Sequence, residues 1–189
     1  MIGAGVIGAA LLIKLVLFPG KSVPAEFTEA RLRGSGLAQA IVSLSGDSLK
    51  SLDQIAKYDR QYNTSEALLL ISKELMRNRE ISQSALRLSS ELERMARAIP
   101  YIRPAAARNS VATAVSLEVA LVSRLFTYND YFRQLFEILQ IRFSRPWEYA
   151  SGKEVAFLIA KINEEAKSIN ELDRQFNETI AEFDRIVNQ

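Results

Sequence analysis

Long stretches of the chain repeat apolar residues at alternating spacings of three and four, which is the period of a packed helix seam. The repeat is clearest over residues 104–144 and 153–187, where eight of ten seam positions in each stretch are apolar. The first seam reads Val111, Val115, Glu118, Val122, Leu125, Asn129, Phe132, Phe136, Leu139 and Phe143. The second reads Val155, Leu158, Ile162, Glu165, Ile169, Leu172, Phe176, Thr179, Phe183 and Ile186. The pattern predicts two long helices of coiled-coil type.

Two further helices are predicted over residues 65–99 and 25–60. Residues 81–99 keep the seam spacing, but Leu68, Ile71 and Leu75 lie one residue out of phase with it. We therefore expect overwinding, or a seam that rotates, near residues 77–80. Residues 25–60 give the weakest pattern, because Ser48 interrupts the seam and three glycines lower helix propensity. A kink or break is expected near residues 34–36.

Proline and capping residues separate these stretches. Asn63 and Thr64 form a helix start, Pro100 and Pro104 end one helix and begin the next, and Pro146 ends the third. No useful length of chain alternates with period two, so no strand is expected. The predicted fold is all-α, with an antiparallel up-down-up-down four-helix bundle over residues 21–189. The alternative is a three-helix coiled coil with the first helix laid aside.

Residues 1–20 are predicted to be a membrane anchor. Residues 2–18 are apolar apart from Lys14, and Pro19-Gly20 then end the segment. A helix of 17 residues spans roughly 25 Å, the lower limit for a hydrocarbon core of about 30 Å. A cleaved signal peptide and a buried helix are the alternatives.

The anchor also predicts an orientation and a packing face. Lys21, Arg31 and Arg33 follow it, so the positive-inside rule places the bundle in the cytoplasm, with an exported bundle as the alternative. Small residues at spacings of four predict packing against other membrane helices or self-association. These residues are Ala4, Gly5, Gly8 and Ala9.

The amino-acid composition excludes several kinds of catalytic and metal-binding site. The chain has no cysteine and no histidine, which removes thiolate sites, the commonest metal ligand and the commonest general base. No phosphate-binding or nucleophile motif is present. The formal net charge of +2 gives no argument for nucleic acid. We therefore expect no catalytic site, no cofactor and no metal.

Three groups of residues are candidates for function. Glu118, Asn129 and Glu165 occupy seam positions and predict a buried polar layer, which more often sets register than performs chemistry. A partner-binding surface is predicted from the aromatic and arginine residues Tyr128, Tyr131, Arg142, Arg145, Trp147 and Tyr149. Contact with lipid headgroups is predicted for Lys21, Arg31, Arg33, Arg97 and Arg103, although neighbouring glutamates would neutralise much of their charge.

An N-terminal anchor followed by a bundle of this size resembles the layout of the LemA-type membrane proteins. Tyr128-Asn129-Asp130 is similar to a tyrosine–asparagine motif in them, but the signature stretch of their first long helix is missing here, so no residue role is carried over. The expected function is a non-enzymatic, membrane-anchored scaffold or assembly subunit whose partners are the membrane and other membrane or helical proteins. A ligand-sensing four-helix bundle and a pilin-like filament subunit are the alternatives.

Overall fold

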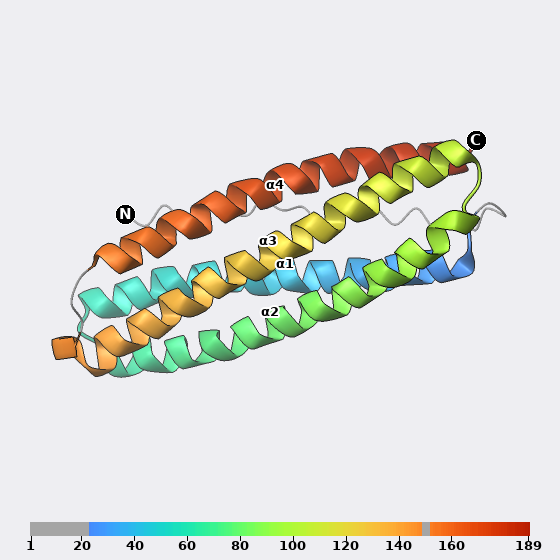
Figure 1. Ribbon diagram of the computed structural model, residues 1–189. Helices are drawn as coiled ribbons and strands as arrows, with labels where there is room; N and C mark the ends of the chain where they lie inside the picture. The colour runs from blue at the N-terminus through green and yellow to red at the C-terminus, as the bar shows by residue number, and fades with distance from the viewer. Residues whose placement is uncertain (1–22, 149–151) are drawn as a thin grey trace.

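Four long helices pack side by side in the computed structural model, which describes residues 23–148 and 152–189 (Figure 1). They are α1 (Ala25–Arg60), α2 (Thr64–Ala98), α3 (Ala105–Ser144) and α4 (Lys153–Val187), and each limit lies within one residue of the predicted one. Two short 3₁₀ turns, Ile99–Tyr101 and Pro146–Glu148, lie in the connections. The described residues contain no strand, so the all-α class is confirmed. The predicted anchor over residues 1–20 lies outside the described residues.

The connections alternate between the two ends of the molecule. Figure 1 shows the α1–α2 connection, the end of α3 and the start of α4 at one end of the molecule, and the α2–α3 connection at the other. Ion pairs agree with this arrangement, since Arg33 near the start of α1 contacts Glu91 near the end of α2. Asp59 at the end of α1 contacts Arg142 at the end of α3. The extensively packed pairs are α1–α2, α2–α3 and α3–α4.

α3 packs against both α2 and α4. The nine predicted seam residues from Val111 to Leu139 are all buried. A second buried row runs beside them at spacings of seven, through Ala114, Leu121, Tyr128 and Leu135. A helix with two neighbours buries a wider face than one seam covers, and this width makes α3 strongly apolar.

The apolar composition of α3 also bears on membrane location. Among the described residues it is the one helix long and apolar enough to cross a membrane, and it lies in the middle of the chain rather than at residues 1–20. The core helix of a bundle in water meets the same criterion. The outer face of α3 carries exposed ion pairs that join Arg133 to Asp130 and to Glu137. We therefore treat α3 as a core helix of the bundle.

The seam of α2 contradicts one expectation. Its buried positions follow one unbroken spacing through Ala67, Ile71, Glu74, Asn78 and Ile81, so the predicted slip near residues 77–80 is wrong. The sequence pattern followed Leu68 and Leu75, which lie in the row beside the buried one. It did so because two residues of the buried row, Glu74 and Asn78, are polar. In α4 the buried row likewise passes through Ala166, Asp173 and Ile180 instead of Glu165, Leu172 and Thr179.

α1 is a single helix, and the predicted interruption at residues 34–36 is wrong. Phe27, Ala30, Ala38 and Ile41 are buried on either side of this stretch, and tertiary packing outweighs the low helix propensity of glycine. The buried residues of α1 belong to the same hydrophobic core as those of the other helices. The first helix therefore does not lie aside from a three-helix coiled coil.

Candidate functional site

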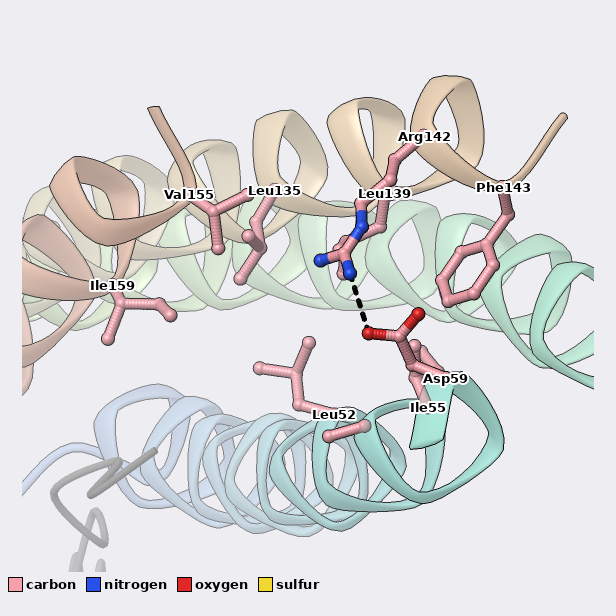
Figure 2. A pocket seen from close by; sticks show the side chains of 10 residues that line it. Leu52, Ile55, Asp59, Leu135, Leu139, Arg142, Phe143, Val155 and Ile159 are labelled. Carbon is pink, nitrogen blue, oxygen red and sulfur yellow. Dashed lines mark hydrogen bonds and ion pairs between the residues drawn. The ribbon is translucent and has the colours of Figure 1, made fainter. Parts of the chain in front are cut away.

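An apolar pocket lies between the end of α1, the end of α3 and the start of α4. Its walls are mainly aliphatic, as Figure 2 shows, and include Leu52, Ile55, Leu135, Leu139, Val155 and Ile159. The half-buried Ala56 contributes a small side chain to the wall, which leaves room that a larger residue would fill. We call this region, formed by residues 52–64, 135–147 and 155–159, the open end of the bundle.

One ion pair stands at the edge of the pocket. Arg142 on α3 donates to Asp59 on α1 over 2.7 Å, and both side chains remain more than a third exposed. The guanidinium also lies 5.9 Å from the centre of the Phe143 ring, which faces the pocket (Figure 2). An exposed pair contributes little to stability, and it gives an otherwise apolar site a polar feature that a ligand can recognise.

Exposed aromatic side chains surround the same end. Tyr62 in the α1–α2 connection is 93% exposed, and Trp147 after α3 is 80% exposed. Phe157 at the start of α4 is also exposed, with the Lys161 ammonium 5.8 Å from its ring. A second hollow, lined by Tyr62, Phe143 and Pro146 among others, shares Asp59 and Arg142 with the pocket. Large exposed aromatic residues gathered on one surface are typical of protein interfaces.

Tyr62 adopts a backbone conformation that does not favour it. Its φ of 57° lies in the left-handed region, where a bulky residue is strained and glycine is the usual residue after a helix. The Asn63 amide donates to the Tyr58 carbonyl over 2.9 Å and ends α1 at this turn. Neither the backbone nor burial explains a tyrosine at this position, which favours a role for its exposed ring.

The predicted partner-binding residues fall into three groups. Arg142, Arg145 and Trp147 lie at the open end. Tyr131 is half buried against the core. Tyr128 is a correction: it is 2% exposed because it belongs to the second buried row of α3, so it cannot contribute to a surface. Burial raises the pKa of its hydroxyl, which has no hydrogen-bond partner among the described residues. Tyr149 lies outside the described residues.

The predicted polar layer is in fact three separate sites. Asn129 is buried, and its side chain joins α3 to α2 through hydrogen bonds. Its amide donates to the Asn78 carbonyl over 2.9 Å and to the Ser82 hydroxyl over 2.8 Å, and the Asn78 amide donates back to its side-chain oxygen over 2.6 Å. Glu165 is half buried and pairs with Arg124 over 3.3 Å, so it does not join Asn129. The side chains of Asn129 and Asn78 are hydrogen-bonded to each other's helix, and the pair fixes the register of α3 against α2. This is the structural role expected of a polar residue at a seam position.

Glu118 is buried apart from the Asn78–Asn129 pair. It is 3% exposed, and burial raises the pKa of its carboxyl group to about 7 despite the nearby Arg31 guanidinium. Asp173 of α4 is also buried, and burial raises the pKa of its carboxyl group although a hydrogen bond with Asn177 opposes the shift. Arg31 of α1 donates to both oxygens of Asp184 over 2.6 and 2.8 Å. The Arg31–Asp184 pair links α1 to α4.

The basic residues predicted to contact lipid do gather towards one end, but their surroundings differ. Arg31 is a correction, because it is buried and paired with Asp184. Arg33 pairs with Glu91 over 3.1 Å, and the exposed Arg97 pairs with Glu93. Arg103 is exposed. Pairing with carboxylates leaves little net positive charge for lipid, and Lys21 lies outside the described residues.

The anchor residues Ala4, Gly5, Gly8 and Ala9 also lie outside the described residues, so their predicted packing role has no structural counterpart here. Within the described residues, no group of three or more carboxylates is placed to hold a metal ion.

Several important residues were not anticipated from the sequence. Asp59 was missed because nothing in the local pattern distinguishes it from other surface carboxylates. Asp173 and Asn78 were missed because each occupies the seam row that the hydrophobic pattern rejected. The spacing of seven shared by Ala114, Leu121, Tyr128 and Leu135 could have revealed the second buried face of α3.

No family model matches the chain, and searches among curated proteins and solved structures gave no match. The resemblance to LemA-type proteins is therefore one of layout, and the candidate site rests on its geometry.

Proposed function

We propose that the chain is a non-enzymatic, membrane-anchored helical scaffold or assembly subunit whose open end binds a partner protein. The observation that carries the proposal is the apolar pocket, which lies among exposed aromatic residues on one end of the bundle. A helical partner would place an aliphatic side chain in the pocket and pack its surface against Trp147 and Tyr62. Burial of a large aliphatic side chain contributes about 1.5–3 kcal/mol to such binding.

The proposed topology is an antiparallel up-down-up-down bundle held to the membrane by residues 1–20, with the bundle in the cytoplasm. Support comes from the alternating connections and from the position of the α1 start, which lies opposite the open end (Figure 1). A helix of 36 residues is roughly 54 Å long. An anchor directly before α1 would therefore leave the open end projecting roughly 50 Å from the membrane, accessible to a partner.

Substitutions in the pocket test the proposal without disturbing the core. Ala56→Leu fills part of the pocket, whereas Ala40→Leu adds the same side chain at an exposed position of the same helix. Proteins that co-purify with the full chain in mild detergent should be retained by Ala40→Leu and reduced at least tenfold by Ala56→Leu. Equal recovery with both variants would contradict a role for the pocket, and a monomer without partners would contradict the scaffold.

A ligand-sensing bundle is the second candidate, since a pocket lined by three helices also suits a small apolar molecule. In that case Ala56→Leu would displace an apolar compound extracted from the purified chain and would leave protein partners unchanged.

A further inference from the structure

The pocket at the open end is small. Its cavity has a volume of about 100 Å³. An apolar cavity of about 150 Å³ holds a benzene ring, and sites for drug-sized ligands measure roughly 300–1,000 Å³. The pocket is therefore too small for a cofactor or a drug-sized compound. Its space suits one branched aliphatic group, such as the side chain of leucine.

The lining of the pocket combines an apolar wall with one charged pair. Among the described residues that line it, Asp59 and Arg142 carry the polar side chains, and the others are aliphatic apart from Phe143. Figure 2 shows the pair reaching across from α3 to α1 beside the aliphatic side chains. A ligand whose aliphatic group fills the pocket would therefore present its polar groups to Asp59 and Arg142.

This pair offers both signs of charge in one place. Arg142 supplies N–H donors and Asp59 supplies carboxylate oxygens, and the bond between them measures 2.7 Å. A guanidinium recognises a carboxylate through parallel N–H···O bonds, and a carboxylate accepts hydrogen bonds from an ammonium group. A ligand with a single charge would match one member of the pair and leave the other unmatched. The arrangement therefore fits a zwitterion.

The bond between Asp59 and Arg142 can be exchanged for bonds to a ligand. Both side chains are more than a third exposed, and an ion pair in contact with water contributes little to stability. The second hollow, which shares Asp59 and Arg142 with the pocket, provides space in which the two side chains can rotate apart. Opening the pair therefore requires no change in the helices.

We propose that the pocket binds a free branched-chain α-amino acid. The aliphatic side chain fills the pocket, the α-carboxylate pairs with Arg142 and the α-ammonium group pairs with Asp59. The inference rests on the pocket of the proposed function, because a bound amino acid and an aliphatic side chain of the partner protein would exclude each other. The concentration of the amino acid would then regulate binding of the partner.

Titration calorimetry of the full chain in mild detergent, with L-leucine as the probe, tests the proposal. L-Leucinamide lacks the carboxylate and 4-methylpentanoate lacks the ammonium group, so each should bind at least about tenfold more weakly than L-leucine. Ala56→Leu fills the pocket and should weaken binding of L-leucine by a similar factor. Ala40→Leu, at an exposed position of the same helix, should bind it as the wild type does.

Arg142→Gln separates recognition of the carboxylate from a general effect on the fold. This variant should lose the preference for L-leucine over L-leucinamide, whereas Arg133→Gln, which removes another exposed ion pair of α3, should keep it. Equal binding of the three probes by the wild type would overturn the proposal, and so would a preference that persists in Arg142→Gln. No binding of L-leucine at millimolar concentration, with partner recovery still reduced by Ala56→Leu, would overturn this inference and leave the proposed function intact.

Discussion

α1 and α4 meet differently at the two ends of the bundle. At the end formed by residues 23–33, 91–104 and 176–187, which we call the closed end, Phe27 packs against Phe183 and Arg31 pairs with Asp184. At the open end, the same two helices present Ala56, Val155 and Ile159 to a pocket. Large rings and a two-bond ion pair join the helices at one end, and smaller side chains leave space between them at the other.

We infer from this difference that the closed end stabilises the fold and that the open end binds a partner. The closed end buries Phe27, Phe176 and Phe183 and exposes Tyr101, whereas the open end exposes both Tyr62 and Trp147. We expect substitutions at the closed end to lower the free energy of unfolding, and substitutions at the open end to change binding more than stability.

The largest expected effect is that of Phe183→Ala. Phe183 is almost fully buried, so its removal leaves a cavity and exposes Phe27 and Arg31. The free energy of unfolding should fall by about 4 kcal/mol, measured by denaturant titration of the full chain in detergent. A loss under about 1 kcal/mol would show that the closed end does not hold α1 to α4.

Glu118→Gln should change how stability depends on pH. The folded-state pKa of Glu118 is about 7 and its ordinary value is 4.5, so the folded chain holds this proton more tightly than the unfolded chain. Its contribution to stability is therefore complete below pH 4.5 and is lost as the pH rises through 7. Wild type should lose about 2–3 kcal/mol between pH 4.5 and 8 that Glu118→Gln retains. Parallel pH profiles for the two proteins would rule this out.

Val155→Ala removes an apolar side chain from the open end. Val155 lines the pocket and is half buried, so water already reaches the space that its loss enlarges. The expected destabilisation is about 1 kcal/mol or less, in the same titration used for Phe183→Ala. A cost of several kcal/mol would show that the open end is packed as tightly as the closed end.

Tyr62→Gly should give the smallest effect, with the opposite sign. Glycine suits a φ of 57°, so the variant should be more stable by about 0.5–1 kcal/mol, measured by thermal unfolding. Partner binding should weaken nevertheless, because the exposed ring is lost. A stabilised variant with unchanged binding would remove Tyr62 from the proposed surface.

The limits of the helices followed from proline and capping residues, whereas the second buried row of α3 was not predicted. The buried rows of α2 and α4 could not be predicted from the hydrophobic pattern, because Glu74, Asn78 and Asp173 are polar residues at core positions. Hydrophobic periodicity selects the more apolar of two adjacent rows, and only the packing of neighbouring helices decides between them.

The functional residues show the same limit. Trp147 and Arg142 were found by composition, because aromatic residues and arginines cluster near the end of α3. The pocket could not be found in this way, because its walls come from α1, α3 and α4 and no single segment of the sequence contains it. The burial of Asp173 rather than Glu165 also depends on how α4 is rotated about its axis, and the spacing of apolar residues selected the row beside the buried one.

Site-specific crosslinking is the most direct test of the account, in which the open end is the partner-binding end. A photoreactive residue replaces Ala56 in the pocket or, as the matched position, the exposed Leu32 near the start of α1. The account predicts a defined crosslinked protein partner from position 56 and none from position 32. A partner crosslinked from position 32 but not from position 56, or from both equally, would contradict it.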